Sequence, residues 1–194
     1  SLVNILYNFQ LMKFIGENGV AAYGVIMYVA FIFIAIFLGY SVGSAPIISF
    51  NYGANNTDEL KNLFRKSIKL IGMCSGAITV LAIALSRILS KFFVGYDVEL
   101  LELTIRGLRL YSISFLFVGF NIFASSFFTA LNNGLVSAII SFFRTLLFQI
   151  VTVLVLPEII GIDGIWLAIV AAEAISLSVS ILFLHGKRKQ YKYI

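Results

Sequence analysis

The chain contains 194 residues, of which 60% are hydrophobic and 12% charged, with a mean hydropathy of +1.01 and a formal net charge of +5. A water-soluble domain of this length has too little interior to bury so much apolar side chain, so most of the chain must lie in lipid. The single cysteine, Cys74, excludes an internal disulfide, and the single histidine, His185, argues against a metal site or Ser–His catalysis.

Six apolar segments follow one another along the chain, and a membrane-spanning helix needs about 20 mostly apolar residues. We therefore expect an all-α integral membrane protein with six transmembrane helices and no enzymatic centre. Because the apolar pattern is already running at Ser1, we expect the first helix to be truncated. The predicted helices cover residues 1–15, 20–48, 66–88, 107–130, 134–156 and 162–184, followed by a basic tail over 185–194.

The second helix ends in a polar, uncharged stretch, "APIISFNYGANN", over residues 45–56. Pro46 has no backbone N–H and leaves the carbonyl of Val42 unpaired, which predicts a bend or unwinding there. Gly53 and the asparagines permit left-handed turn geometry. The following "TDELKNLFRKSIK" places acidic residues before basic ones, which is typical of a short amphipathic entry helix.

The later connections differ in length and polarity. "VGYDVELLELTIRGLRL" mixes leucines with charges, which predicts a helix lying in the membrane interface with Asp97 as its N-cap. "LNNG" and "PEIIGIDG" are short, so the helices that they join should be antiparallel neighbours.

Alternate connections divide the lysines and arginines unequally, eight against five, and the richer side is expected to be cytoplasmic. This bias explains the net charge without any nucleic-acid partner. The richer side carries Lys61, Arg65, Lys66, Lys69, Lys187, Arg188, Lys189 and Lys192, and the other carries Lys13, Arg87, Lys91, Arg106 and Arg109.

Two Gly-x-x-x-Gly pairs, Gly39 with Gly43 and Gly72 with Gly76, place small residues on one helix face. In lipid, such faces allow helices to approach closely. Either the pairs hold the lobe together or they form a surface that slides during a transport cycle.

Polar residues recur at helical spacing in several spans and must find partners or face a water-filled cavity. Interhelical hydrogen bonding and contact with a transported substrate are the two alternatives. Possible cavity-lining residues are Asn8, Asn121, Gln149 and Ser176.

Only two charges lie deep in the spans, Arg144 and Glu173. At 1.5 Å per residue, Arg144 lies about 15 Å from the start of the fifth helix and Glu173 about 16 Å from the end of the sixth. Two opposite charges at one depth on adjacent antiparallel helices should pair, directly or through one polar bridge, because an unpaired charge there is far costlier. The pair is either a static clamp or a relay in which Glu173 releases Arg144 and takes up a proton or cation, with Ser176 and Ser180 on the same helical face.

The motif "GSAPIISFNYGANN" with the basic "ELKNLFRKS" after it resembles the end of the second helix in a lobe of the multidrug and toxic compound extrusion (MATE) transporters. "GLVSAIISFFRTLLFQIVTVLVLPEIIGIDGIWLAIVAAEAISLSVSILF" resembles the last two helices of the same family. The resemblance covers essentially the whole chain, as the C-terminal six-helix lobe of a twelve-helix transporter.

The resemblance implies two lobes around a central cavity and export of organic cations or drugs in exchange for protons or sodium ions. It implies no cofactor beyond the coupling ion. The implied partners are the N-terminal lobe of the same polypeptide, membrane lipid and small amphipathic or cationic substrates. The implied location is the bacterial plasma membrane.

Three other classes remain as alternatives. A lipid-linked oligosaccharide flippase of related fold would need several mid-membrane cations, and only Arg144 qualifies. A membrane-embedded enzyme would need histidine with an acid, or clustered acids and bases. A purely structural membrane module would need neither.

Overall fold

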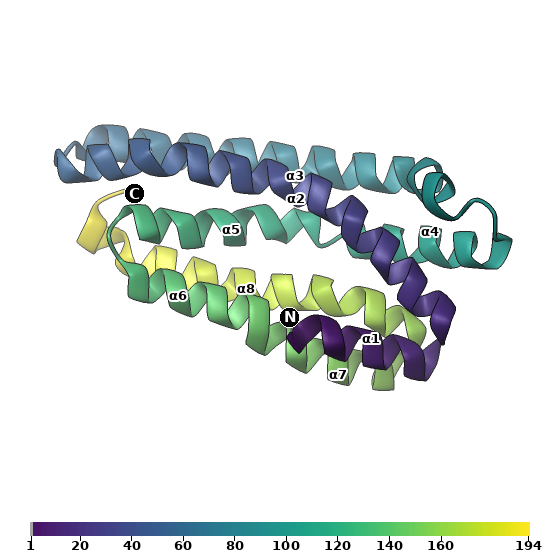
Figure 1. The fold of residues 1–194 in the computed structure, drawn as a ribbon. Helices are drawn as coiled ribbons and strands as arrows, with labels where there is room; N and C mark the ends of the chain where they lie inside the picture. Colours follow the sequence, from purple (N-terminus) through teal and green to yellow (C-terminus); the bar gives the residue numbers. More distant parts are fainter. Residues whose placement is uncertain (1) are drawn as a thin grey trace.

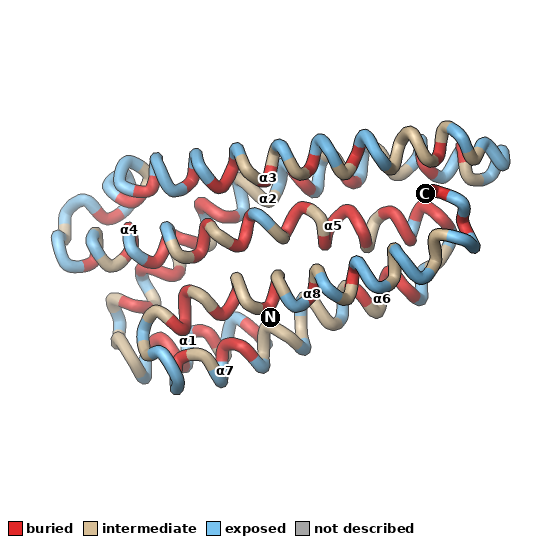
Figure 2. Tube along the Cα trace, turned by 180° about the vertical axis from the view of Figure 1, so that it is seen from behind, coloured by how far each residue is buried: buried red, intermediate tan, exposed pale blue. Residues whose placement is uncertain are grey.

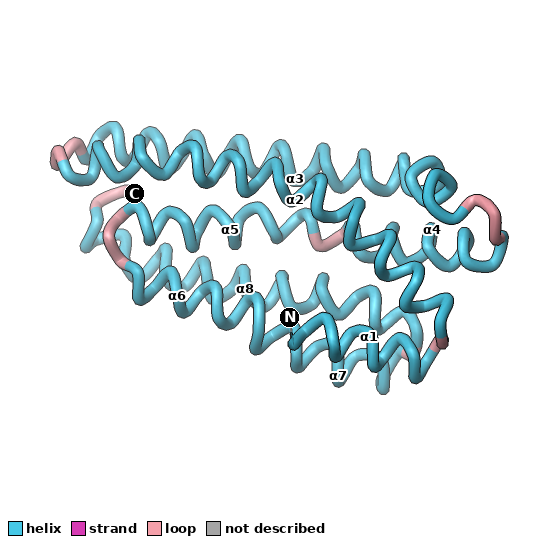
Figure 3. Tube along the Cα trace, viewed as in Figure 1, coloured by secondary structure: helices cyan, strands magenta, loops and turns pink. Residues whose placement is uncertain are grey.

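A computed structural model describes residues 2–194, and this part of the chain consists of helices joined by short turns, without a strand (Figure 3). Its elements are α1 (Leu2–Phe14), α2 (Glu17–Gly53), α3 (Thr57–Val94), α4 (Val98–Ser112), α5 (Phe115–Ala130), α6 (Gly134–Phe142), the π-helical turn η1 (Phe143–Leu147), α7 (Phe148–Ile160) and α8 (Ile162–Tyr191).

Among the described residues, four helices are long and apolar enough to cross a membrane: α2, α3, the composite Gly134–Ile160 and α8. A fifth span results if α4 and α5, which meet at a 48° bend, count as one. At 13 residues, α1 is shorter than a span. These helices run up and down in one bundle (Figure 1).

We call the end with the 53–57 and 130–134 turns the inner end; α8 also finishes there, close to the α5–α6 turn (Figure 1). The opposite end is the outer end. In the structure the basic segment that begins at His185 is not a separate tail, because α8 continues helical to Tyr191.

Helix α5 forms the centre of the bundle and packs against α2, α3, α6 and α8. Its buried side chains follow most of its length, whereas α3 shows a broad exposed face (Figure 2). The exposed face of α3 is itself apolar, as in Met73 and Phe92, which are 74% and 85% exposed. Exposed apolar side chains on long helices are what a lipid solvent requires, so the chain is an integral membrane protein.

Close helix packing depends on Gly107 and Gly119, which the sequence pattern does not single out. A Cβ at Gly119 would lie 2.6 Å from the Phe37 ring, and one at Gly107 would lie 2.8 Å from Ile26 Cδ1. In contrast, no atom lies within 4 Å of a Cβ built at Gly39, Gly43 or Gly76. Of the two alternatives for the Gly-x-x-x-Gly pairs, packing within the lobe is therefore not supported at these three positions, since no other described helix comes close to them.

The sequence predicts that α4 lies in the membrane interface. In the structure α4 instead packs between α2, α3 and α8. Its leucines face these helices, since Leu100 and Leu108 are at most 4% exposed. The N-cap prediction is confirmed, because the Asp97 side chain accepts a hydrogen bond from Leu100 N at 3.1 Å.

Helix α2 continues through Pro46 to Gly53, and α3 begins only four residues later as one unbroken helix. The predicted entry helix and third span are thus a single element. The turn between them uses Asn55 in the left-handed region (φ 55°), and Asn56 Oδ1 accepts from Glu59 N to cap α3. The α5–α6 turn repeats this arrangement: Asn132 has φ 58° and Asn133 caps α6.

Candidate functional site

The two deep charges lie in the middle of the last two spans, which the structure packs side by side. Arg144 belongs to η1, a five-residue π-helical turn inside the span from Gly134 to Ile160. Glu173 lies near the middle of α8. The connection at Gly161, with φ 66°, reverses the chain between α7 and α8 and makes them antiparallel neighbours. Single π-turns inside α-helices occur frequently at functional sites.

Arg144 and Glu173 are in direct contact. Arg144 Nε lies 2.9 Å from Glu173 Oε1 and 3.0 Å from Oε2, so one N–H is shared between both carboxylate oxygens. The Glu173 side chain is 1% exposed and that of Arg144 is 16% exposed. Within residues 2–194 the two Nη atoms of Arg144 have no hydrogen-bond partner. The guanidinium therefore uses only part of its donor capacity on the carboxylate.

Asn121 on α5 extends the contact into a chain of polar groups. Its Nδ2 donates to Glu173 Oε2 at 2.8 Å and to the Glu173 backbone carbonyl at 2.9 Å. Its Oδ1 accepts from Ser180 Oγ at 2.8 Å. Asn121 and Ser180 are both fully buried. The cation and the amide donor next to this buried carboxylate offset the free-energy cost of removing its charge from water.

Two buried tyrosines, Tyr7 on α1 and Tyr111 on α4, lie within electrostatic range of Glu173 without a hydrogen bond to it. The Tyr7 ring stacks on that of Tyr23 with centroids 5.1 Å apart. Tyr7 Oη and Ser176 Oγ are buried without a hydrogen-bond partner among the described residues. These two buried hydroxyl groups therefore have unused hydrogen-bonding capacity.

The structure places the four possible cavity-lining residues in different surroundings. Asn8 is exposed and lines a cleft of about 480 Å³ between α1 and α2, together with Tyr23, Tyr28 and Phe31. Asn121 and Ser176 are fully buried between helices, so they line no open cleft in this structure. Gln149 is half-buried, and its side chain makes no hydrogen bond to any residue in 2–194.

Other polar residues of the spans hydrogen-bond between helices. Ser125 Oγ on α5 lies 2.9 Å from Ser137 Oγ and 2.8 Å from Ser141 Oγ, both on α6. Thr129 Oγ1 donates to Ser137 Oγ at 2.7 Å. Here interhelical bonding, the simpler of the two alternatives, accounts for the polar stripe.

Sequence reasoning missed Tyr7, Tyr23 and Tyr111. Tyrosine is common at many positions of a membrane helix, and its spacing does not reveal which ring turns inward. The one feature of the sequence that could have indicated Tyr7 is its position directly before Asn8, which is predicted to line a cavity. Across residues 2–194 no three histidine, cysteine or acidic side chains gather as a metal site would need.

Comparison with known proteins gives matches to a family and to solved structures. The sequence profile of the MatE family matches residues 1–155. None of the curated proteins matches the chain.

Three solved structures illustrate the likeness, each 21% identical to this chain. An inward-facing multidrug resistance MATE family transporter of the MOP superfamily has a TM-score of 0.92, covering 98% of this chain and 44% of its own. A MATE crystal structure in complex with MaL6 has a TM-score of 0.90, covering 100% of this chain and 44% of its own. A MOP superfamily transporter from Pyrococcus furiosus has a TM-score of 0.90, with 98% and 43% covered.

This chain thus spans less than half the length of each solved chain, while nearly all of it superposes. The predicted all-α membrane architecture, equivalent to one half of such a structure, is confirmed.

Proposed function

The chain belongs to the MatE family, and we propose that it forms the C-terminal lobe of a secondary active antiporter that exports organic cations or drugs in exchange for protons or Na⁺. The family predicted from the residues is confirmed, and it is a family of membrane transporters, not of enzymes. The other lobe of the same polypeptide would be the chief partner, and the plasma membrane of a bacterium would be the location.

The observation that carries the proposal is the buried carboxylate of Glu173 with its two kinds of partner. Protonation of Glu173 removes its attraction for Arg144. The Asn121 contacts can persist, because an amide N–H also donates to the carbonyl oxygen of a carboxylic acid. Proton uptake would therefore mainly release one cation, and Arg144 already has free Nη donors. In this proposal Glu173 is the coupling group and Arg144 is the element that it releases.

A proton suits this site better than Na⁺ does. A sodium ion needs several oxygen ligands, whereas the Asn121 oxygen already accepts from Ser180. Both carboxylate oxygens of Glu173 already accept from Arg144. Na⁺ coupling remains the second possibility and is tested separately.

The cleft at Asn8 is the part of the lobe best suited to contact the substrate. Its lining combines two amides with the rings of Tyr23, Tyr28 and Phe31. Aromatic faces attract organic cations, and apolar rings accept the hydrophobic part of an amphipathic compound. Among the described residues no carboxylate lines the cleft, so affinity would depend on ring stacking and amide contacts.

The flippase alternative gains no support from the structure. A site for an anionic lipid phosphate inside the membrane needs uncompensated positive charge. The one deep cation of the chain, Arg144, has a carboxylate against it.

Export assays on the full-length polypeptide test the proposal. We would express it in an efflux-deficient bacterium and measure resistance to cationic dyes and drugs, with and without sodium and with a protonophore. Glu173→Gln should be produced at normal levels with a near-normal melting temperature, yet lose ion-coupled export. Glu99→Gln, which changes an exposed acid at the outer end, is the matched control and should export normally.

The double exchange Glu173→Arg with Arg144→Glu separates coupling from a static clamp. Coupling through Glu173 requires that the exchange does not restore export. If Glu173→Gln mainly unfolds the protein and the exchange restores both folding and export, the pair is a clamp and the coupling role is wrong.

A further inference from the structure

The positive charges at the inner end have no acidic partners, in contrast to those at the outer end. Three of the four ion pairs within residues 2–194 lie at the outer end, Lys13–Glu158, Arg87–Glu102 and Arg106–Asp163. The fourth is the buried pair of Arg144 and Glu173. The inner end has eight lysines and arginines and only two acids, Asp58 and Glu59. Its charge is therefore available to a ligand from outside the described chain.

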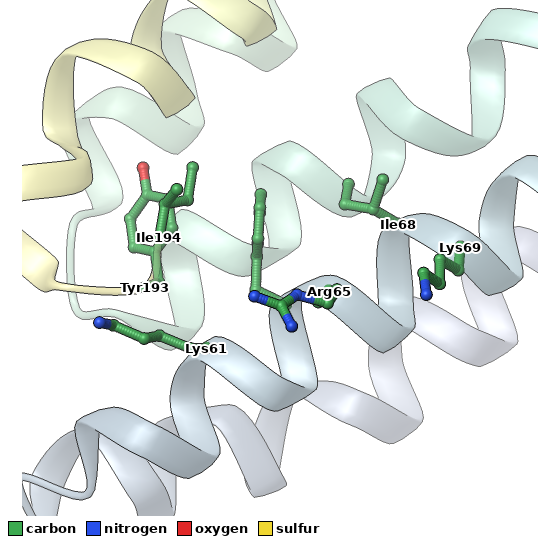
Figure 4. Close-up of a pocket in the computed structure, with 7 residues that line it drawn as sticks. Lys61, Arg65, Ile68, Lys69, Tyr193 and Ile194 are labelled. Carbon is green, nitrogen blue, oxygen red and sulfur yellow. The ribbon is translucent and has the colours of Figure 1, made fainter.

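Three of these cations line one pocket of about 350 Å³ (Figure 4). Lys61, Arg65 and Lys69 are spaced four residues apart on α3, which places them on one face of the helix. The remaining wall is apolar, formed by Phe64 and Ile68 of the same helix and by Tyr193 and Ile194 after the end of α8. The pocket thus combines a row of positive charge with a hydrophobic floor.

The segment after α8 is held firmly as a wall of this pocket. Lys192 has φ 53° and turns the chain back toward α3. The Tyr193 ring lies against Phe64 and Phe127, with centroids 5.0 and 4.9 Å apart, and its hydroxyl donates to the Leu184 carbonyl at 2.6 Å. The Tyr193 phenol is neutral at physiological pH, and burial raises its pKa still further above the ordinary value of 10.0, so it does not repel an anion.

The charge pattern of α3 indicates that the pocket lies at the depth of lipid headgroups. Lys69 is the last charge before the apolar run of residues 70–85, so it marks the edge of the hydrocarbon. From Lys61 to Lys69 the helix rises about 12 Å, which is more than the headgroup layer of about 5–8 Å on each side of a bilayer. The row of cations therefore crosses the whole headgroup layer, and the apolar floor continues toward the acyl chains.

We propose that this pocket binds an anionic phospholipid, with the phosphate at Lys61, Arg65 and Lys69 and the start of an acyl chain on Phe64, Ile68 and Ile194. Basic pockets at the cytoplasmic side of membrane helices suit acidic headgroups. A free phosphate would leave the apolar floor unused. A zwitterionic lipid would bring a positively charged ammonium group next to three cations.

Lipid titration of the purified, delipidated full-length protein, followed by native mass spectrometry, tests the proposal. We expect phosphatidylglycerol to bind with higher affinity than phosphatidylcholine of the same chain length. Each cation near a membrane surface contributes about fivefold to affinity, so Lys61→Gln with Arg65→Gln and Lys69→Gln together should lower phosphatidylglycerol affinity by about 100-fold. Ile68→Ser should also weaken it without changing any charge.

A matched variant removes three cations from the same end outside the pocket, Lys187→Gln with Arg188→Gln and Lys189→Gln. It should bind phosphatidylglycerol normally. An equal loss in this variant would show that general surface charge attracts the lipid, and the proposal would be wrong. Displacement of the lipid by millimolar inorganic phosphate, or an unchanged affinity in Ile68→Ser, would overturn it in favour of a simple anion site. Should the triple variant not fold, Arg65→Gln carries the test, because Arg65 is exposed. None of these readouts depends on transport.

Discussion

Two serines on α8 show how partners decide the energetic effect of a buried hydroxyl. Ser176 and Ser180 are both fully buried on the same helix. Ser180 donates to Asn121 Oδ1, whereas Ser176 Oγ has no partner among residues 2–194. A buried polar group without a partner has lost its bonds to water and gained nothing in exchange.

We predict that Ser180→Ala lowers the free energy of unfolding by about 1–3 kcal/mol, because Asn121 Oδ1 is then buried without a donor. Ser176→Ala should leave stability unchanged or raise it slightly, since it removes only an unpaired hydroxyl. Thermal unfolding of the full-length protein in detergent measures both. Equal losses in the two variants would contradict this view of the network around Asn121.

For single residues, the sequence predicts the depth in the membrane well, but it predicts poorly toward which neighbouring helix a side chain points. The rise per residue of an α-helix places Arg144 and Glu173 at one level, and the structure has them in contact. The involvement of Asn121 and Tyr7 depends on how three helices are rotated about their axes. Hydrophobic periodicity gives little information on rotation in lipid, because both the lipid-facing and the inward side are apolar.

At the level of helices, Gly119 marks a close approach where α5 crosses α2 and α3. Gly119 faces the Phe37 ring and Ile71 Cγ2 with no room for a methyl group. Gly39 on α2, in contrast, faces open space. The two glycines therefore separate the effect of packing from the effect of helix propensity.

We predict that Gly119→Ala destabilises the lobe by about 1–3 kcal/mol, because the added Cβ would lie 2.6 Å from an aromatic ring that cannot retreat from the core. Gly39→Ala should be neutral or stabilising by up to about 1 kcal/mol, as expected for alanine in a helix. Melting temperatures of the full-length protein would show the difference. If Gly39→Ala were as harmful as Gly119→Ala, the face of Gly39 would have to be covered by a part of the protein outside residues 2–194.

The existence and order of the long helices follow from the sequence, whereas their junctions do not. Apolar runs of more than 20 residues predict α2, α3 and α8 with shifts at their ends. The bend between α4 and α5 and the π-turn at Arg144 have no composition signal of their own. Pro46 is the opposite case, because it predicts a break and α2 nevertheless continues as a helix through it to Gly53. A lipid-embedded helix can continue through a proline when its neighbours support the backbone.

For the whole molecule, the two ends of the bundle differ in how their charges are satisfied. The acids and bases of the outer end neutralise one another, and the inner end retains a surplus of lysine and arginine. An excess of these residues marks the cytoplasmic side of membrane proteins.

We predict that Asn56 and Gln190 are cytoplasmic and that Tyr96 lies on the opposite side. Cysteines at these positions, introduced singly after Cys74→Ala, would be treated with an impermeant maleimide added to intact cells. Only Tyr96→Cys should be labelled, and all three should be labelled after permeabilisation. Labelling of Asn56→Cys and Gln190→Cys from outside would reverse the orientation and remove the basis for a cytoplasmic lipid site.

The π-turn at Phe143–Leu147 places one surplus residue inside an otherwise regular helix. A turn of this kind could shift along the helix by one residue without displacing the helix on either side. In a helix, a step of this kind turns only the side chains that it passes, by about 100° each, while both ends of the span keep their positions. Arg144 lies inside the turn, so the side chain that such a step would redirect is the one that contacts Glu173. A shift of the turn by one residue would therefore separate Arg144 from Glu173 without any rigid movement of the lobe.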